Sequence, residues 1–387
     1  MYIKNTAVMS TEFAKNPFII NNYQGKEYFC DREHNVESLI NNIQNELNTT
    51  LISIRRIGKT GLIKQLFTII EEKFNYPCLF IDLFASQNLN DFTNQLANEI
   101  ARKFPEKNSA GKRFLKGIKQ LRPVIQFDAL TGEPAISFDA IQQNEIPKTI
   151  QQLLSFLEQQ TTPIIIAFDE FQQINEYPEK NTEAILRTII QDVKNLRFIF
   201  SGSKKHILTE IFGNSKRPFY ASTHIEYLDF IPEEKYKAFI LHHFEKNNRK
   251  ITEEDVDFIL TWTNRHTYFV QMVCNRVFAS GKRKISRSDI LMQCDKILKD
   301  QEVFFYQYRN LLSQQQWSVL KAISKEEKLY QYTGKEFLAK YKFTNASAVK
   351  RCVDALLEKE MIYQENDEHG TFIRTYDVFL QKWFLNK

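Results

Sequence analysis

Glycine and proline are scarce in this chain, which has 11 glycines and 10 prolines among 387 residues. Collagen-like chains and disordered chains rich in proline and glycine need far more of these residues, so the sequence excludes both classes. Hydrophobic residues make up 43% of the chain and charged residues 26%, and 32 phenylalanines are present. This composition predicts a packed, mostly helical globular protein. Its length exceeds what one hydrophobic core usually supports, so we expect two or three domains.

Long apolar runs are also missing. No apolar run reaches the roughly eighteen residues of a membrane-spanning helix, and the mean hydropathy is −0.42. The first residues, MYIKNTAVMSTEFAKN, lack the apolar block of a signal peptide. We therefore expect no membrane contact and no export by that route.

Cysteine is rare and dispersed. The chain has no Cys-x-x-Cys pair and an odd number of cysteines, so we expect neither a disulfide framework nor a structural zinc site. This pattern suits a reducing cytosol, and we expect a cytoplasmic protein. The five cysteines are Cys30, Cys78, Cys274, Cys294 and Cys352.

Neither sign of charge is in large excess. The chain has 52 lysines and arginines against 47 aspartates and glutamates, which gives a net charge of +5. An excess this small does not by itself predict nucleic acid or a membrane as the partner.

Five short runs of β-branched, aromatic and other apolar residues are typical of buried strands. Long stretches with helical periodicity separate most of them, and this alternation predicts a parallel sheet covered by helices on both faces. One such helix is expected over residues 31–47. The expected strands cover residues 51–54, 78–84, 164–168, 198–200 and 225–230.

An insertion interrupts this pattern at about residues 122–140. Alternating apolar residues lie on both sides of Thr131 and Gly132. We therefore expect a β-hairpin between the second and third strands of the sheet. These elements together predict an α/β domain over residues 1–231.

The strands stop after residue 231. Three candidate helix starts with acids in the first turn follow at Pro232, Thr252 and Ser286. Acids near a helix N-terminus compensate its positive dipole, so these positions predict a compact helical domain over residues 232–305.

Residues 306–387 have a third pattern. Two capping boxes predict helix starts, and a third helix and two short strands follow. Three helices followed by a hairpin form a winged helix. The capping boxes are Ser313 with Gln316 and Thr333 with Glu336, the third helix is expected over residues 345–360, and the strands lie around Ile362 and over 372–376.

A Gly-Lys-Thr sequence stands between the first predicted strand and an apolar helix. At such a junction it is typical of a phosphate-binding loop, because a helix N-terminus offers unpaired N–H groups and partial positive charge. We expect Lys59 to reach the β and γ phosphates of a nucleotide and Thr60 to supply a hydroxyl to Mg²⁺. The expected nucleotide-binding residues are Ser53, Arg55, Arg56, Ile57, Gly58, Lys59, Thr60 and Gly61.

Ser53 takes the place of the first glycine in the GxxxxGK[ST] pattern. Glycine tolerates a positive φ or a close backbone approach that serine tolerates less well. The alternative is a chance Gly-Lys-Thr at an exposed helix start. The preceding buried strand and the acids at 169 and 170 favour the phosphate loop.

Asp169 and Glu170 follow the apolar run 164–168. Acids in this position lie at the carboxyl edge of the sheet, where the phosphate loop also lies. We expect Asp169 to hold Mg²⁺ through water, and Glu170 to take a proton from, or orient, the water that attacks the γ phosphate. The alternative is that two acids end the strand because solvent begins there.

Ser201 ends the predicted strand that follows, before Gly202 and Ser203. A small polar residue at this edge is a candidate for contact with the γ phosphate or the attacking water. A Ser/Gly turn that only leaves the strand is the alternative.

Nearly the whole chain, from about Asn16 onward, resembles the archaeal-type ATPase branch of the P-loop NTPases, which is related to the STAND and origin-licensing AAA+ ATPases. The resemblance implies an α/β fold with a parallel sheet in the order 5-1-4-3-2, a helical lid, ATP with Mg²⁺, and a winged-helix domain that binds DNA or regulates. The resembling segments are Phe29 to Glu33, Arg55 to Thr60, Phe168 to Phe171, Ser201 to Ser203, Arg217 to Tyr220 and the winged-helix tail.

The chain departs from the family pattern at two further places. The lid motif, usually Gly-His-Pro followed by aromatics, is Arg265-His266-Thr267-Tyr268-Phe269 here, without the proline. The arginine that commonly follows the Pro-Phe-Tyr stretch is absent. Arg217 is then the best candidate for a catalytic arginine finger, and a surface ion pair is its alternative role.

DNA is a candidate partner at two places. Residues 107–122 hold six basic residues, no acid and one apolar side, which suits contacts with nucleic-acid phosphates. A solvated helix face is the alternative. Lys350 and Arg351 lie on the winged-helix segment expected to enter a major groove, although the wing turn is acidic.

The leading hypothesis is an ATP-dependent molecular switch, with ATP bound between sheet and lid, slow hydrolysis, and a rearrangement passed to the winged helix. The rival hypothesis is a non-catalytic DNA-binding adaptor in which the nucleotide is structural. An ATPase of a mobile element or a defence pathway is a third hypothesis. The sequence identifies no protein partner.

Overall fold

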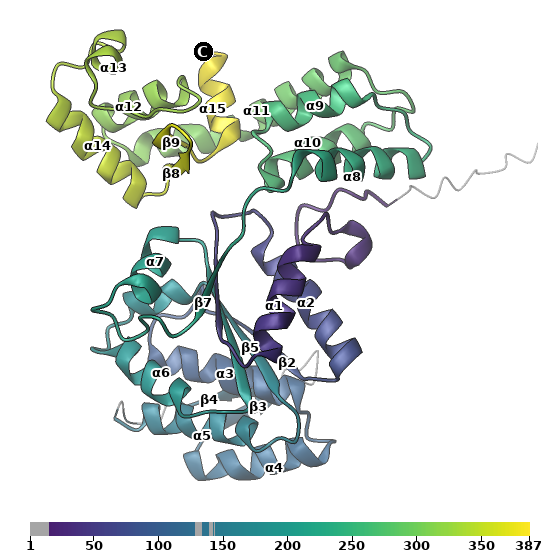
Figure 1. The fold of residues 1–387 in the computed structure, drawn as a ribbon, viewed down its shortest axis with the longest axis vertical. Coiled ribbons are helices and arrows are strands. Elements are labelled where there is room, and N and C mark those ends of the chain that lie inside the picture. Colours follow the sequence, from purple (N-terminus) through teal and green to yellow (C-terminus); the bar gives the residue numbers. More distant parts are fainter. Residues whose placement is uncertain (1–14, 128–133, 139–141, 143) are drawn as a thin grey trace, which may run out of the picture. The chain divides into compact units, whose positions relative to one another are not determined.

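The computed structural model describes residues 15–127, 134–138, 142 and 144–387 and forms two compact units (Figure 1). Unit 1 contains residues 15–20 and Pro232–Lys387, and unit 2 contains Asn21–Ile231. The division into three domains with boundaries at residues 231 and 305 stays a prediction.

Unit 2 is built on a five-stranded parallel sheet in the order β2-β5-β6-β1-β7. Counted along these strands alone, and from the other edge, this is the order 5-1-4-3-2, so the expected α/β fold is confirmed. The central strands β5 and β6 are buried along their whole length, as expected of parallel strands that have helices on both faces. The strands are β1 (Thr49–Ile52), β2 (Cys78–Asp82), β5 (Ile164–Asp169), β6 (Leu196–Gly202) and β7 (His224–Tyr227).

Helices cover the two faces of this sheet. Neighbouring residues of β5 point to opposite faces, so Phe168 joins the apolar core under α3, α5, α6 and α7, while Ala167 joins the core under α1 and α2. The helices of unit 2 are α1 (Glu33–Gln44), α2 (Lys59–Phe74), α3 (Leu89–Lys103), α4 (Ser109–Ile118), α5 (Ile146–Glu158), α6 (Thr182–Gln191) and α7 (Lys205–Gly213), with 3-10 turns η1 (Lys26–Tyr28), η2 (Lys119–Leu121) and η3 (Phe171–Glu176).

The predicted hairpin insertion is confirmed. Strands β3 (Val124–Phe127) and β4 (Pro134–Ser137) pair antiparallel, and the predicted turn at Thr131 and Gly132 lies outside the described residues. Asn98 of α3 holds the hairpin: its Nδ2 donates to the Ile136 carbonyl at 3.0 Å, and its Oδ1 accepts from the Ile136 N–H at 2.6 Å.

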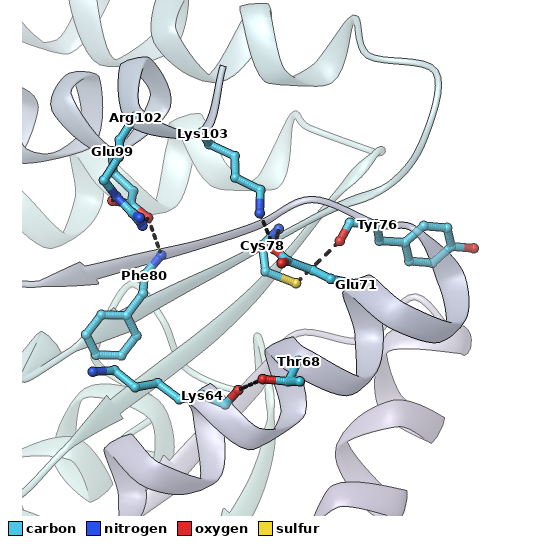
Figure 2. A network of polar contacts seen from close by, with 9 residues as sticks. All are labelled: Lys64, Thr68, Glu71, Tyr76, Cys78, Phe80, Glu99, Arg102 and Lys103. Atoms are coloured by element: carbon cyan, nitrogen blue, oxygen red, sulfur yellow. Dashed lines mark hydrogen bonds and ion pairs between the residues drawn. The ribbon is translucent and has the colours of Figure 1, made fainter. Parts of the chain in front are cut away.

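Two carboxylates cap the outward N–H groups of the edge strand β2 (Figure 2). The Cys78 N–H donates to Glu71 Oε1 of α2 at 3.1 Å, and the Phe80 N–H donates to Glu99 Oε1 of α3 at 3.0 Å. An open sheet edge can pair with a strand of another chain, so these two acids block the edge of the sheet. The basic partners of the two carboxylates are Lys103 for Glu71 and Arg102 for Glu99.

Unit 1 contains helices followed by a winged helix. Thr252 caps α9, and Ser313 forms the predicted capping box of α12 with Gln316. Strands β8 and β9 pair antiparallel after α14, which confirms the predicted hairpin. The elements are α8 (Glu233–Lys246), α9 (Glu253–Trp262), α10 (Thr267–Ala279), α11 (Arg287–Leu311), α12 (Gln314–Ser324), α13 (Lys335–Lys340), α14 (Ala346–Glu358), β8 (Ile362–Asp367), β9 (Gly370–Thr375) and α15 (Val378–Leu385).

Two features of unit 1 differ from the sequence-based expectation. The capping box of Thr333 and Glu336 is wrong, because α13 begins at Lys335 with Gly334 as its N-cap and without a side-chain cap. The last helix, α15, is absent from the prediction; Asp377 caps it by accepting from two backbone N–H groups.

Across the part of the chain that the structure describes, no helix combines the length and the apolar character that a membrane crossing requires.

Candidate active site

The loop between β1 and α2 holds the predicted phosphate-binding residues. β1 ends at Ile52, two residues earlier than predicted, so Ser53 already belongs to the loop. Gly58 is the N-cap of α2 with a φ of 108°, a left-handed conformation that favours glycine. Lys59 is the first residue of α2, and its side chain is buried although lysine is usually exposed.

Ser53 occupies the first glycine position of the pattern without backbone strain. It is buried and does not belong to the described residues that have a positive φ. Its Oγ donates to the Ile54 carbonyl at 2.9 Å. The backbone at this position therefore has no need of glycine, whereas Arg56 in the same loop does adopt a positive φ of 58°.

Asp169 lies at the centre of the predicted site. The Thr60 hydroxyl donates to Asp169 Oδ2 at 2.7 Å, and the Ser201 hydroxyl donates to Asp169 Oδ1 at 2.6 Å. Because β6 pairs with both β1 and β5, the ends of these strands meet at one edge of the sheet. The structure thus brings together three residues that the sequence places far apart.

Glu170 follows directly with a φ of 53°. Its Oε2 accepts from the Ser203 hydroxyl at 2.8 Å and from the Ser203 N–H at 3.3 Å, and it also accepts from Gln172 Nε2. Arg55 Nε donates to Ser203 Oγ at 3.2 Å. Ser203 therefore connects the phosphate loop to Glu170 through two hydrogen bonds.

Gln172 and Ser203 are contacts of Glu170 that the sequence analysis missed. Ser203 belongs to the Ser-Gly-Ser segment that carries the family resemblance, so a signal was present in the sequence. Gln172 is buried, and Gly202 makes room for it, since a Cβ at Gly202 would lie 1.9 Å from Gln172 Oε1.

Asp82 is a third acid at this edge of the sheet, and the sequence analysis also missed it. It ends β2 directly opposite Asp169 in the strand register. Partial removal from water raises the pKa of the Asp82 carboxyl, and the charges of Asp169 and Glu170 add to this effect. The available signal was an acid inside the predicted strand 78–84, which the expected sheet order 5-1-4-3-2 places beside the strand that Asp169 follows.

Arg217 contacts residues outside the predicted phosphate-binding site. Its guanidinium pairs with Glu183 of α6 and Glu210 of α7, and it donates to Asn175 Oδ1 at 3.0 Å. These contacts match the surface ion-pair alternative, and no contact to Asp169 or Glu170 is present among the described residues. Its role as an arginine finger stays a prediction.

The segment before α1 packs against the phosphate loop. A Cβ at Gly61 would lie 2.9 Å from the ring of Phe29, so a larger residue at position 61 would make this ring shift. The buried Arg32 donates to the Ile57 carbonyl at 3.5 Å. Two of the resembling segments, at 29–33 and 55–60, are therefore in direct contact.

Comparison with protein families gives two matches. A model described as "ATPase domain predominantly from Archaea" matches residues 29–273, and a model described as "Probable winged helix domain" matches residues 303–386. A search of curated proteins found no match to this chain.

Three solved structures with the same fold come from archaea. The Walker-type ATPase PABY2304 of Pyrococcus abyssi has a TM-score of 0.66 at 17% identity, with 95% of this chain and 99% of that chain covered. The Aeropyrum pernix ORC2 protein in ADPNP–ADP complexes has a TM-score of 0.56 at 13% identity, with 96% and 97% covered. The Aeropyrum pernix ORC1 protein in complex with DNA has a TM-score of 0.52 at 10% identity, with 94% of each chain covered. At these identities the likeness establishes the fold alone.

Proposed function

We propose, since this chain belongs to the family of ATPase domains found predominantly in Archaea, that it binds ATP at residues 53–61 and hydrolyses it slowly in a Mg²⁺-dependent reaction. The contact of Thr60 with Asp169 carries this proposal. A hydroxyl after the loop lysine and an acid that ends another strand of the sheet are the residues that hold Mg²⁺ in P-loop ATPases. Here Thr60 Oγ1 and Asp169 Oδ2 lie 2.7 Å apart.

The residues of this edge fit Mg²⁺. Thr60 and Asp169 supply oxygen donors, which Mg²⁺ prefers, and Mg²⁺ is usually held by one or two carboxylates together with substrate phosphates and water. Over the described residues, no group of three or more His, Cys, Asp or Glu side chains is placed to hold a metal ion by itself. When bound, the ion neutralises phosphate charge, so we propose that it binds together with the nucleotide.

The remaining residues receive roles from their chemistry and position. Lys59 neutralises charge on the β and γ phosphates. Glu170 accepts a proton from the attacking water or orients it, and Ser201 aligns the γ phosphate or that water. Arg217 is the candidate arginine finger, a role that requires it to leave its ion pair with Glu183.

Two variants test this function. Lys59→Ala is expected to abolish ATP binding in equilibrium dialysis, because it removes the cation that faces the phosphates. Glu170→Gln is expected to preserve ATP binding and suppress phosphate release. Unchanged ATP binding in Lys59→Ala contradicts the phosphate-loop assignment, and normal turnover in Glu170→Gln transfers the role of base to another residue.

We further propose that the nucleotide state is communicated to the winged helix, as in a molecular switch. Such a switch requires that ATP bind one conformation more tightly than the other. Arg55 of the phosphate loop donates to Ser203, which donates to Glu170. We propose that these two hydrogen bonds change with the nucleotide state.

A DNA-binding adaptor with a structural nucleotide is the second candidate. Lys350 and Arg351 are exposed on α14, the helix that would face a major groove. The acidic wing turn argues against this role, because its negative charges repel DNA phosphates. These acids are Glu365, Asp367 and Glu368. Duplex binding measured over a salt series, together with phosphate release, separates the two: tight binding without hydrolysis favours the adaptor.

A further inference from the structure

Residues 107–122 carry a net charge larger than that of the whole chain. The whole chain carries +5, and this segment contains six basic residues and no acid, so the other residues sum to −1. The excess that is mild over the whole chain is therefore dense in one segment. The six residues are Lys107, Lys112, Arg113, Lys116, Lys119 and Arg122.

All six basic side chains are exposed on α4, on η2 and on the residues at either side of them. Among the described residues, no ion pair neutralises any of the six. Helix α4 lies at the bottom border of unit 2 in the view of Figure 1. A solvated helix face usually mixes both signs of charge, and this one does not.

The opposite side of α4 is buried in the hydrophobic core. Phe114 is 1% exposed and Ile118 is 4% exposed, and the Phe114 ring packs against Phe156 of α5 with centroids 5.0 Å apart. A helix that inserts into a bilayer surface needs its apolar face free, so this helix is unsuited to that role. Phe114 is the segment's single aromatic residue, so no exposed ring is available to stack single-stranded bases.

We propose that this exposed face, residues 107–122, binds the phosphate backbone of a double-stranded nucleic acid without reading its base sequence. Lys112 and Lys116 lie four residues apart on α4, and Lys119 begins η2 three residues later. At the rise of a helix, these three residues span about 10 Å. A DNA duplex carries one charge per roughly 1.7 Å of its axis, so the same length presents about six phosphates. The inference is independent of ATP hydrolysis and of the winged helix.

The test measures binding by fluorescence anisotropy with labelled duplex DNA, duplex RNA and single-stranded DNA of equal length over a salt series. The variant Lys112→Gln/Lys116→Gln/Lys119→Gln removes three exposed charges from this face. The matched control, Lys73→Gln/Lys180→Gln/Lys194→Gln, removes the same charge from exposed positions dispersed over unit 2. ATP binding and circular dichroism verify that each variant is folded.

The variant is expected to bind duplexes at least about tenfold more weakly at ~100 mM salt, with a salt slope reduced by about 0.9 for each lost contact. The control is expected to retain the wild-type slope, and the DNA and RNA arms show which duplex is preferred. An unchanged slope in the variant, or an equal loss in the control, overturns the proposal. Absence of duplex binding by the wild type also overturns it, and binding to phosphatidylserine vesicles in its place assigns the face to a membrane.

Discussion

Among single residues, Glu170 has the surroundings that bear most directly on turnover. Its carboxylate accepts from Ser203 and Gln172, and Ser203 also accepts from Arg55 of the phosphate loop. A carboxylate with several donors keeps one position, and a general base needs its water within hydrogen-bond reach. We infer that Ser203 positions Glu170.

Replacing Ser203 by alanine is expected to lower kcat about tenfold and to leave KM within about twofold. A hydrogen bond to a charged group contributes about 1.5–3 kcal/mol, and about 1.4 kcal/mol corresponds to a tenfold change in rate. Steady-state phosphate release measures both constants. Ser203→Thr keeps the hydroxyl and is expected to restore most of the rate; an unchanged kcat in Ser203→Ala disproves the positioning role.

Restoring the family glycine at position 53 is expected to bring no gain in ATP affinity. Ser53 has no positive φ, so glycine relieves no strain there and instead adds freedom to the unfolded chain. Ser53→Gly is therefore expected to lower the free energy of unfolding by about 0.5–1 kcal/mol. Urea unfolding and ATP titration measure the two quantities, and a markedly tighter ATP complex is the result that contradicts this account.

At the residue scale the sequence predicted the contacts that follow from a motif, and it missed those that depend on strand register. Thr60, Asp169 and Ser201 were assigned because each one ends a strand or begins a helix in a known pattern. Asp82 lies beside Asp169 only through the pairing of β2 with β5. A local sequence does not specify which residues of two strands stand opposite each other.

Among the elements, strand β2 forms one edge of the sheet, and side chains of α2 and α3 cap its outward N–H groups. The double variant Glu71→Ala/Glu99→Ala leaves the outward N–H groups of Cys78 and Phe80 without their acceptors. We expect concentration-dependent association, seen by light scattering, because an open edge is a template for strand pairing. Glu72→Ala, the neighbouring exposed acid on α2, is the matched control and is expected to stay monodisperse. Equal behaviour of the two variants removes the protective role of the two caps.

The element boundaries show where local patterns suffice. The capping box of Ser313 was predicted correctly, because its side chain does accept from the Gln316 N–H. The same pattern wrongly predicted a capping box at Thr333. The Gly334 N–H donates to the Gln331 carbonyl at 3.0 Å and forms a turn, and the helix begins after this turn. Helix α15 was missed because a short apolar run has no clear periodicity, although Asp377 was an available N-cap signal.

At the scale of the whole molecule, the proposed switch requires that ATP bound at the phosphate loop of unit 2 change the conformation of unit 1. The family resemblance implied the sheet order, and the residue pattern predicted the winged helix. Coupling is a free energy difference between two states, and no pattern of residues encodes it directly. A switch has two conformations of the chain, and ATP shifts the balance between them only if it binds one more tightly than the other. The contacts of Arg55 and Ser203 differ between nucleotide states only under this condition.

Hydrogen exchange of the full chain measures this coupling. In the Glu170→Gln variant, we expect ATP and Mg²⁺ to change the rate of amide exchange in α14 (Ala346–Glu358). The expected change is about 5- to 150-fold, which is the factor that typical allosteric coupling free energies produce. Lys59→Ala with the same ligands is the control and is expected to show no change, because it lacks the phosphate-binding cation. If protection is confined to Asn21–Ile231, the proposal of ATP binding stands and the switch is rejected. A ligand that binds equally well whichever state unit 1 adopts does not change the populations of those states.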